Sequence, residues 1–384
     1  MSLIYLDSAA TSGYKDVDNI IIDAIINAMK QSWQNPSSLY ASNVKEEINR
    51  CRVNIANFIG ANTSEIIFTS GASESNNAAI RGWVDEIWLT TYKTPHIIST
   101  NIEHKSILEL LENSNLDAIV RYCDVDEFGI VDLESLEHRL AMNKGEPTLV
   151  SIHMANNEIG TIQPIKEISN LVHKYNGVLH VDATQAVGHI PINVEEFGID
   201  LMSASGHKIS PVLKGIGFLY KKNGIDIQPL IYGMQEDGLR GGTENVFGIV
   251  GFNKAIEYCD ISHTNIKEMC DKRTYFIEQL ENKFDCELNG DSYYRLPNNI
   301  NVTFPQNITG ESLLYILDLS DIKISTGSAC NSESITPSHV LKAIGLSDSE
   351  SIRTVRFSLS NDITYEQIDD VIAEIDKAIK LIEV

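Results

Sequence analysis

The chain has 384 residues, more than one ordinary hydrophobic core accommodates, so its length predicts two domains. It carries 53 Asp and Glu against 30 Lys and Arg, and the net charge of -23 argues against broad binding to nucleic-acid phosphates, although it does not exclude a local basic patch. No apolar run is long enough to cross a bilayer, and the first residues lack the pattern of a secretory signal, so we expect a cytoplasmic protein that does not enter a membrane.

The cysteines indicate neither a metal site nor a disulfide framework, because no two of them form a Cys-x-x-Cys pair. This usage suits a reducing compartment. They are Cys51, Cys123, Cys259, Cys270, Cys286 and Cys330. The first five lie in helix or strand patterns, where a free cysteine is normally buried and inert.

The first two thirds of the chain alternate between strand and helix patterns. A short strand or arm at 3–6 and a helix at 17–33 come first, followed by a helix that Gly60 is expected to end. Its apolar residues recur at spacings of three and four, which predicts a buried face: Val44, Ile48, Cys51, Ile55 and Phe58. We then expect strands at 66–69, 96–100, 118–122, 149–154, 178–181, 201–204 and 217–220, and helices at 74–83, 105–112, 133–140 and 165–175. This alternation predicts a parallel sheet covered by helices on both faces.

The pattern changes near Tyr258. Strand-like runs at 299–304 and 354–359 then mix with long helices, the last of which is amphipathic. Its apolar positions are Ile368, Val371, Ile372, Ile375, Ile379 and Ile382. We therefore expect a large domain at 16–258 and a small α+β domain formed by 1–15 and 259–384.

Polar side chains follow two of the expected strands directly. The strands at 178–181 and 201–204 are each followed by chemistry-bearing residues: Asp182, Gln185, Ser205, His207 and Lys208. Ligands of α/β sheets bind at the carboxyl ends of the strands, so these side chains are expected to meet in one pocket. A lysine that forms a Schiff base, with an acid that keeps a pyridine nitrogen protonated, is what pyridoxal phosphate chemistry requires. Taken alone, Asp182 would more often be an ordinary helix cap and Lys208 a solvated surface lysine. The presence of both residues favours a functional site.

Three further segments follow strands. The segment 69–77 is rich in small residues and opens a helix, which suits a phosphate at the helix N-terminus, although an ordinary capping box has the same appearance. His104 and the turn at 156–160 also lie at strand ends, where each by itself would more often be structural. Together they strengthen the prediction of one site.

With these motifs in place, the chain resembles the cysteine desulfurases of the pyridoxal phosphate-dependent class V aminotransferase family. The resemblance runs from Tyr5 to Leu359. Its motifs are Gly-Ala-Ser-Glu-Ser-Asn at 71–76, Glu-His-Lys at 103–105, Asn-Asn-Glu-Ile-Gly at 156–160, His-Val-Asp-Ala-Thr-Gln at 180–185, Ser-Gly-His-Lys at 205–208, Arg-Gly-Gly-Thr at 240–243 and Ser-Thr-Gly-Ser-Ala-Cys at 325–330. It implies an α/β fold of the aspartate aminotransferase-like type (fold type I), with a large, mostly parallel sheet domain and a smaller α+β domain.

The resemblance also implies roles around pyridoxal 5'-phosphate. Lys208 would carry the cofactor, Asp182 would pair with its pyridine nitrogen and Gln185 with its phenolic oxygen, and His104 would stack on the ring and help move protons. The phosphate would be held by Ala72, Ser73, Ser205 and His207. Thr243 would reach the phosphate of the other subunit, which implies a homodimer.

For the substrate, L-cysteine, the resemblance implies that Arg356 grips the carboxylate, as a bidentate fork suits. Asn157 would contact cofactor or substrate, and Asn35 would line the substrate site. Cys330 would accept the sulfur as a persulfide and pass it to an acceptor protein, an iron-sulfur scaffold or a tRNA-thiolating enzyme. The surroundings of Cys330 support this, because a thiol among Gly, Ser, Thr and Asn follows no apolar periodicity.

The chain departs from the family pattern at three places. Ser73 stands where Thr is usual and keeps the hydroxyl. The loop 210–215 is one residue longer than usual, which leaves the geometry beside Lys208 open, and Asn331 follows Cys330 in place of Thr or Ser. Three alternatives to a desulfurase stay open at this stage: a selenocysteine lyase, an aminotransferase of the same fold, and a catalytically weak sulfur-relay protein.

Overall fold

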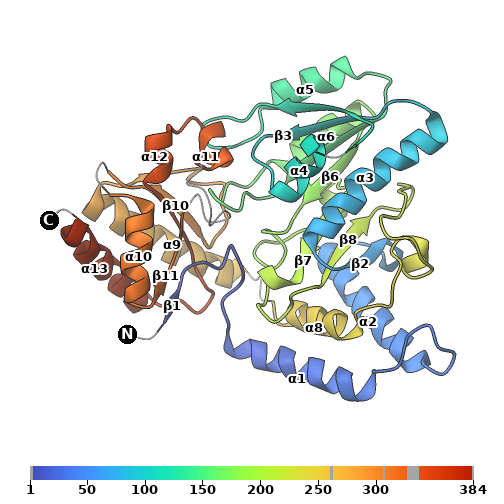
Figure 1. Ribbon diagram of the computed structural model, residues 1–384, viewed down its shortest axis with the longest axis horizontal. Coiled ribbons are helices and arrows are strands. Elements are labelled where there is room, and N and C mark those ends of the chain that lie inside the picture. Colours follow the sequence, from blue (N-terminus) through green and yellow to red (C-terminus); the bar gives the residue numbers. More distant parts are fainter. Residues whose placement is uncertain (1–2, 114, 260–262, 306–307, 327–336, 383–384) are drawn as a thin grey trace.

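The structure is a computed structural model that describes residues 3–113, 115–259, 263–305, 308–326 and 337–382. It has two lobes that lie side by side (Figure 1). The larger lobe contains a seven-stranded sheet, and the smaller lobe holds both ends of the chain. None of the helices in the described segments is long and apolar enough to cross a membrane.

The large sheet has the strand order β2-β8-β7-β6-β5-β3-β4. The bounds are β2 (Ile66–Thr69), β3 (His96–Thr100), β4 (Ile119–Cys123), β5 (Thr148–His153), β6 (Val178–Asp182), β7 (Leu201–Ser205) and β8 (Gly217–Lys221). Only β8 runs against its neighbours, because it pairs antiparallel with both β2 and β7 while β7-β6-β5-β3-β4 are parallel. The sheet is therefore mostly parallel, as expected.

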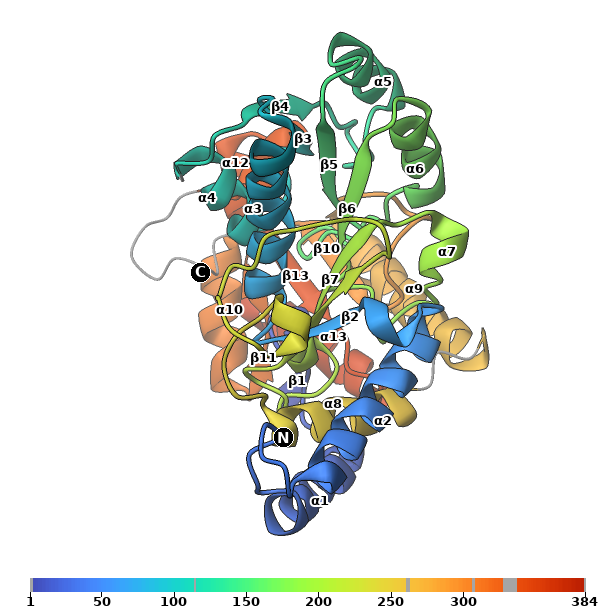
Figure 2. The ribbon, with the colours of Figure 1, turned by 90° about the vertical axis from the view of Figure 1, so that its right-hand side faces the viewer.

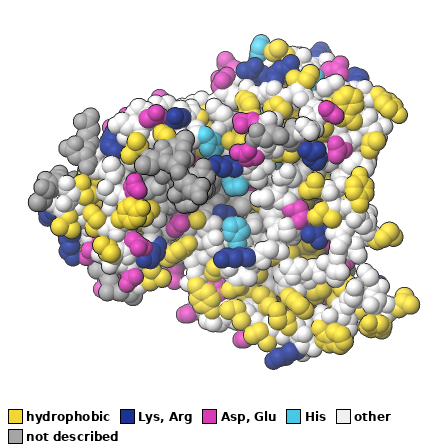
Figure 3. All heavy atoms as spheres, viewed as in Figure 1, with side chains coloured by type: hydrophobic (Ala, Val, Ile, Leu, Met, Phe, Trp, Pro, Cys, Tyr) yellow, Lys and Arg dark blue, Asp and Glu magenta, His cyan; other side chains and the backbone are white. Residues whose placement is uncertain are grey.

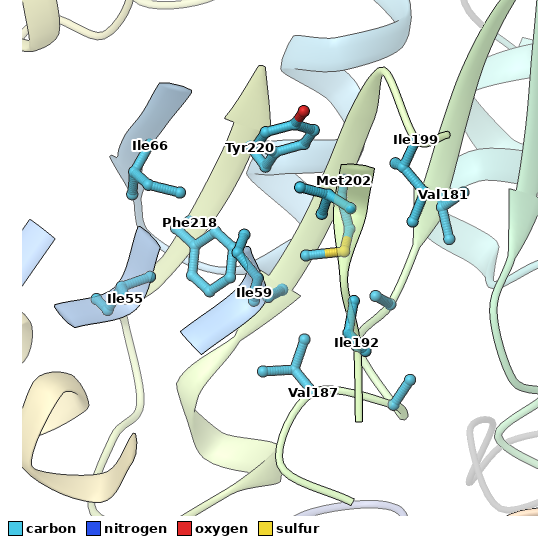
Figure 4. Packing of buried hydrophobic residues seen from close by; sticks show 14 of the residues in the cluster. Ile55, Ile59, Ile66, Val181, Val187, Ile192, Ile199, Met202, Phe218 and Tyr220 are labelled. Carbon is cyan, nitrogen blue, oxygen red and sulfur yellow. The ribbon is translucent and has the colours of Figure 1, made fainter. Parts of the chain in front are cut away.

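Successive strand residues alternate between two apolar layers. Ile97, Leu149 and Leu201 pack on one face with α3 (Ala72–Thr91) and α4 (Lys105–Asn113). The residues next to them pack on the other face with four helices: α2 (Ser42–Ile59), α5 (Leu133–Met142), α6 (Ile165–Lys174) and α8 (Val246–Glu257). Figure 4 shows this second layer, in which Phe218 and Met202 lie against Ile59 of α2. Because both faces are covered, the central strands β5, β6 and β7 are buried almost throughout.

The predicted helices are confirmed; the bounds of one of them differ clearly, and one further helix was not predicted. The helix expected at 17–33 is α1 (Asp16–Gln31), and the next ends at Gly60, whose φ of 71° is left-handed. Helix α3 begins at Ala72 and ends at Thr91, well beyond the predicted 74–83. Helix α8 was not predicted, because its residues are apolar on nearly every side and show no amphipathic period; it is buried against α1 and α2.

The smaller lobe is built on an antiparallel sheet of order β12-β13-β10-β9. Its strands are β9 (Glu287–Leu288), β10 (Asn299–Thr303), β12 (Ser325–Thr326) and β13 (Thr354–Ser358), and β1 (Ile4–Tyr5) pairs in parallel with β11 (Ile322–Lys323) nearby. Its helices are α9 (His263–Phe284), α10 (Gly310–Leu319), α11 (His339–Ala343), α12 (Asp348–Ile352) and α13 (Tyr365–Ile382). The predicted face of α13 is buried from Ile368 to Ile375, whereas Ile379 and Ile382 are only half-buried.

The N-terminal residues Ile4 and Leu6 belong to the apolar cluster of the smaller lobe, while Val246 and Ile256 belong to that of the larger lobe. Figure 2 shows the N-terminal strand β1 behind the large sheet and α1 and α2 along its lower side. The domain boundaries at residues 16 and 258 stay a prediction, which this distribution of buried side chains supports.

Candidate active site

The carboxyl ends of β3, β5, β6 and β7 lie along one edge of the large sheet, which faces the smaller lobe. Asp182 ends β6 and Ser205 ends β7, and His104 follows β3 by four residues. Figure 3 shows histidine and basic side chains gathered in the hollow between the lobes. The four strand ends therefore form the floor of one candidate site.

Asp182 is a buried carboxylate that is hydrogen-bonded only by neutral donors among the described residues. Its Oδ2 accepts from Asn76 Nδ2 at 2.8 Å, and its Oδ1 accepts from the backbone N–H of Thr184 at 3.0 Å and from the Thr184 hydroxyl. Within the described segments it forms no salt bridge. A buried carboxylate is costly without a cationic partner, so Asp182 suits a positively charged N–H group on a bound molecule.

Lys208 lies in the turn that follows β7, and its ammonium is directed at the N-terminal segment. Its Nζ donates to the carbonyls of Ala9 at 2.6 Å and Ala10 at 2.9 Å, and Gln185 Nε2 also donates to Ala9 O at 3.0 Å. Lys208 and Gln185 are thus brought together on one acceptor, as the sequence predicted for the cofactor pocket. The N-terminal segment itself was not predicted to take part.

His104 is exposed in the hollow, and Ser106 contacts its ring nitrogen Nδ1. The hydroxyl of Ser106 lies 2.9 Å from Nδ1, and the backbone N–H of Ser106 donates to it at 3.1 Å. Surrounding protein atoms desolvate the ring and lower the pKa of His104, as does the neighbouring charge of Lys208, whereas Asp182 opposes this shift. The ring is therefore neutral near pH 7.

His207 lies beside Lys208, with its Nδ1 at 3.2 Å from the Thr11 hydroxyl. Burial lowers the pKa of His207 to about 4, and the positive charges of Lys208 and Lys214 add to this effect. A neutral imidazole at this position can donate a hydrogen bond to an anion without adding a second positive charge.

Ala72 and Ser73 form the first turn of α3, at the same corner as Ser205. A Cβ atom on Gly71 would lie 3.4 Å from Ser205 Oγ, and one on Gly217 would lie 2.6 Å from Gly71 Cα. Glycine is therefore required at 217 for β8 to approach the start of this helix. The free N–H groups of the first turn and the nearby hydroxyls provide the donors that a phosphate needs.

Thr243 is exposed in the segment between β8 and α8. Its neighbours Gly242 and Glu244 line a small hollow together with Thr69 and Ser70, which precede α3. This position is therefore exposed and close to the start of α3.

Arg356, on β13, is brought into the site from the smaller lobe. It is 8% exposed; its Nη2 donates to Asp7 Oδ1 at 2.6 Å and its Nη1 to the carbonyl of Asn157 at 3.0 Å. Its Nε is buried and has no partner within the described residues. A buried guanidinium N–H without a partner is an unsatisfied donor, which an acceptor such as a carboxylate would satisfy.

Two residues that were predicted for the site, Asn35 and Cys330, are not placed there by the described part of the chain. Asn35 lies in the connection between α1 and α2, where it is exposed and its side chain accepts from Ser37 N at 2.9 Å. Its neighbours Pro36 and Ser37 line a different hollow of about 710 Å³ with Met234. Cys330 lies outside the described residues. Beyond that segment, Ser338 donates to Glu158 Oε2 at 2.5 Å and the ring of His339 to Glu103 O at 3.0 Å.

The remaining cysteines differ in part from the expectation that all five are buried. Cys51, Cys123 and Cys286 are buried, whereas Cys259 and Cys270 are half-buried. Burial raises the pKa of Cys51 and of Cys123 to about 12, so neither thiol ionises near neutral pH. Cys259, which follows α8, contacts the Gly188 carbonyl through its sulfur at 3.0 Å.

The sequence analysis missed several residues of the site. Asp7 and Ala9 follow the expected arm at 3–6, Ser106 follows the motif at 103–105, and Thr184 lies inside the motif at 180–185, but none of them was predicted to take part. No local pattern marks Asp7 or Ala9, because their partners lie about 200 to 350 positions away in the chain. Asn76 and Ser106 could have been found, since each follows a strand by a few residues.

The geometry can now be compared with known proteins. The family model of class-V aminotransferases matches residues 4–371, nearly the whole chain. The chain belongs to the class-V aminotransferase family. Enzymes of this family use pyridoxal 5'-phosphate, and the residues fit that group: Asp182 has no cationic N–H partner within the described residues, and the corner at Gly71 offers donors to a phosphate.

Among class-V relatives, the chain is 41% identical over 385 residues to the cysteine desulfurase IscS of Dictyoglomus turgidum, which covers 98% of this chain and 94% of that protein. It is 40% identical over 385 residues to the cysteine desulfurase IscS of Methanosarcina thermophila, with 98% and 92% covered. A solved NifS-like protein superposes with a TM-score of 0.89 at 34% identity, covering 99% of this chain and 100% of that one. SspA in complex with cysteine superposes with a TM-score of 0.80 at 35% identity, covering 93% and 99%.

Proposed function

We propose that this protein is a cysteine desulfurase that converts L-cysteine to L-alanine and holds the sulfur as a persulfide on Cys330. The observation that carries the proposal is the meeting of Lys208, Asp182 and His104 at one sheet edge with Arg356 from the other lobe. Relatives named cysteine desulfurase match nearly the whole chain and support the choice of substrate.

When bound, pyridoxal phosphate supplies a ring that withdraws electrons from the carbon next to the substrate amino group. Lys208 would be its attachment point, and Asp182 would keep the proton on the pyridine nitrogen. Gln185 would donate to the phenolic oxygen, and Ala72, Ser73, Ser205 and His207 would hold the phosphate. His104 would donate and accept a proton at Nε2, the ring nitrogen that Ser106 leaves free.

Arg356 would bind the substrate carboxylate through Nε and the remaining hydrogen of Nη2, because Asp7 and the Asn157 carbonyl occupy other N–H groups. Asn157 would contact cofactor or substrate from the same turn. The carboxylate would thereby orient the side chain of cysteine toward the acceptor thiol.

The sulfur step is a transfer between two thiols. The Cys330 thiolate attacks the sulfur of the substrate, and an S–S bond forms as the C–S bond breaks. The electron pair of the broken bond stays on carbon, which takes up a proton to become the methyl group of alanine. Sulfur then passes to an acceptor protein, an iron-sulfur scaffold or a tRNA-thiolating enzyme, and the enzyme acts as a homodimer in which Thr243 reaches the neighbouring phosphate.

The test replaces Cys330 by Ser in the cofactor-loaded protein. Cys330→Ser should still bind cysteine and change the cofactor spectrum, yet carry no persulfide and release no sulfide. Cys51→Ser is the matched control, because Cys51 is buried in α2 and its thiol does not ionise near neutral pH.

Other outcomes point to the alternatives. Alanine formation at the parent rate by Cys330→Ser would overturn the desulfurase step and favour a lyase that expels its chalcogen without a protein thiol. A requirement for an added keto acid would indicate an aminotransferase. If the parent protein consumes no cysteine under either condition, it is a sulfur-relay protein that retains the fold.

A further inference from the structure

A chain of hydrogen bonds joins Asp182 to His104, two of the groups that the proposed chemistry uses. Asn76 Nδ2 lies 2.8 Å from Asp182 Oδ2 and 2.9 Å from Ser106 Oγ, and Ser106 Oγ lies 2.9 Å from His104 Nδ1. Asn76, on α3, is completely buried. We call Asp182, Asn76, Ser106 and His104 the hydrogen-bond chain.

The direction of each hydrogen bond follows from the first. An ionised Asp182 can only accept, so the amide nitrogen of Asn76 must face it, and the same nitrogen then donates to Ser106 Oγ. Because Ser106 Oγ accepts from Asn76, its single hydrogen is free to point at His104 Nδ1. The buried Oδ1 of Asn76 has no partner in the described protein, and turning the amide round to satisfy it would set two acceptors against each other at Asp182.

His104 Nδ1 is thus an acceptor twice, from the Ser106 hydroxyl and from the Ser106 backbone N–H at 3.1 Å. A neutral imidazole carries one hydrogen, so that hydrogen must lie on Nε2. Protonating Nδ1 would give up both of these hydrogen bonds, so each of the two donors favours the tautomer with its hydrogen on Nε2.

We infer that Asn76 and Ser106 are positioning residues that fix the tautomer of His104, with its hydrogen on Nε2, by transmitting the orientation imposed by Asp182. The lowered pKa of His104 agrees with this arrangement, although desolvation of the ring by surrounding protein atoms is its first cause. Other charges near the ring are those of Asp182, Lys208, His339 and Glu103. The inference rests on the proposed function only where it predicts how replacing Ser106 changes the turnover of the enzyme.

The experiment is nitrogen-15 NMR of the imidazole groups in the full chain without added cofactor, with His104→Gln to assign the His104 signals. The parent should show a pyridine-type Nδ1 and a protonated Nε2 above the pKa of His104. Ser106→Ala removes one of the two donors, so the Nδ1–H tautomer should become detectable and the pKa of His104 should rise by about 0.5 to 1 unit, the effect of one ordinary hydrogen bond.

The chain offers a matched control. Ser151 Oγ lies 2.9 Å from His180 Nδ1, the same contact on a buried histidine of the same sheet. Ser151→Ala should alter the His180 signals and leave those of His104 unchanged, whereas Ser106→Thr, which keeps the hydroxyl, should restore the parent tautomer. Asn76→Ala should shift His104 in the same direction as Ser106→Ala.

Turnover separates the inference from the proposed function. In the loaded enzyme, Ser106→Ala should lower kcat about tenfold and change KM less than about twofold, because proton transfer and not binding is affected. A parent His104 that carries its hydrogen on Nδ1, or a Ser106→Ala protein with parent tautomer and pKa, would overturn the inference. A changed tautomer with parent turnover would confirm the hydrogen-bond chain and contradict the proton-transfer role of His104.

Discussion

Arg356 shows how one side chain can be held ready for a ligand. Its guanidinium is buried, and two of its nitrogens are held by Asp7 and by the carbonyl of Asn157, while Nε is unpaired within the described residues. Asp7 comes from the N-terminal segment and Asn157 from the turn after β5, so three distant parts of the chain determine where the free N–H points. A planar fork is needed for this, and lysine cannot replace it.

Arg356→Lys should therefore raise the KM for cysteine by at least about tenfold, because an ammonium cannot hold Asp7, the Asn157 carbonyl and a substrate carboxylate in one plane. The effect on kcat should be smaller. Steady-state kinetics of alanine formation would check this, with Arg353→Lys as the control, since Arg353 lies one residue before β13 and donates to the Ser349 carbonyl outside the site. An unchanged KM would contradict the role of Arg356.

Three adjacent strands, β5, β6 and β7, carry a layer of hydrogen-bonded polar side chains that is buried next to the site. His180 on β6 lies between Ser151 Oγ of β5 at 2.9 Å and Ser203 Oγ of β7 at 3.0 Å, two residues before Asp182. Its ring is completely buried, and this burial lowers the pKa of His180 to about 4 from the ordinary 6.5. Both ring nitrogens have partners, so the neutral form is well accommodated while a cation would be desolvated.

This layer predicts a pH dependence of stability. Below pH 6.5 the unfolded chain protonates His180, while the folded protein keeps it neutral down to about 4, so lowering the pH through this window favours unfolding. The contribution is present above pH 6.5 and is lost as the pH falls. His180→Gln, which cannot titrate, should lose roughly 1–2 kcal/mol less than the parent between pH 7 and pH 5.

Urea unfolding at the two pH values would measure this difference. His138→Gln is the control, because His138 is exposed on α5 and its replacement should leave the pH dependence of the parent unchanged. Equal losses in the parent and in His180→Gln would show that His180 does not titrate differently in the two states.

At the scale of the whole molecule, apolar side chains are exposed along one side of the larger lobe. Trp33 is 67% exposed and Leu39 is 99% exposed, and both lie in the connection between α1 and α2. Met234 is 89% exposed and lines the hollow of about 710 Å³ together with Pro36 and Ser37 of that connection. Large exposed apolar side chains that lie together mark interaction surfaces. Figure 3 shows apolar side chains gathered along the lower side of this lobe. We propose that this surface is the contact of the proposed homodimer.

The double variant Trp33→Asp, Leu39→Asp should shift the protein from dimer to monomer in sedimentation velocity, because two charges would be buried without partners in the contact. It should also lower cofactor affinity, since Thr243 would no longer reach the neighbouring phosphate. Leu319→Asp, at an 87% exposed position on α10 of the smaller lobe, should leave both unchanged. A double variant that stays dimeric would place the contact elsewhere.

Most of the fold could be predicted, because the spacing of apolar residues within each short segment indicates whether that segment forms a helix or a strand. The strand at 96–100 and the helix ending at Gly60 were predicted closely, since an apolar run and a glycine are local signals. The antiparallel direction of β8 could not be predicted, because a strand of the same composition fits either direction and its partners decide. Helix α8 was missed because a helix buried on nearly every side has no polar face to reveal its period.

The sequence by itself determined the family of this protein and the residues of its candidate site: a lysine and an acid at neighbouring strand ends, and a histidine after another strand. Only the tertiary structure decided which side chains hold these groups in place. Asp7 reaches Arg356 across nearly the whole chain, and Asn76 joins Asp182 to His104 from a helix on one face of the sheet. Such contacts depend on how strands and lobes are arranged in space, and no periodicity within a short stretch records that arrangement.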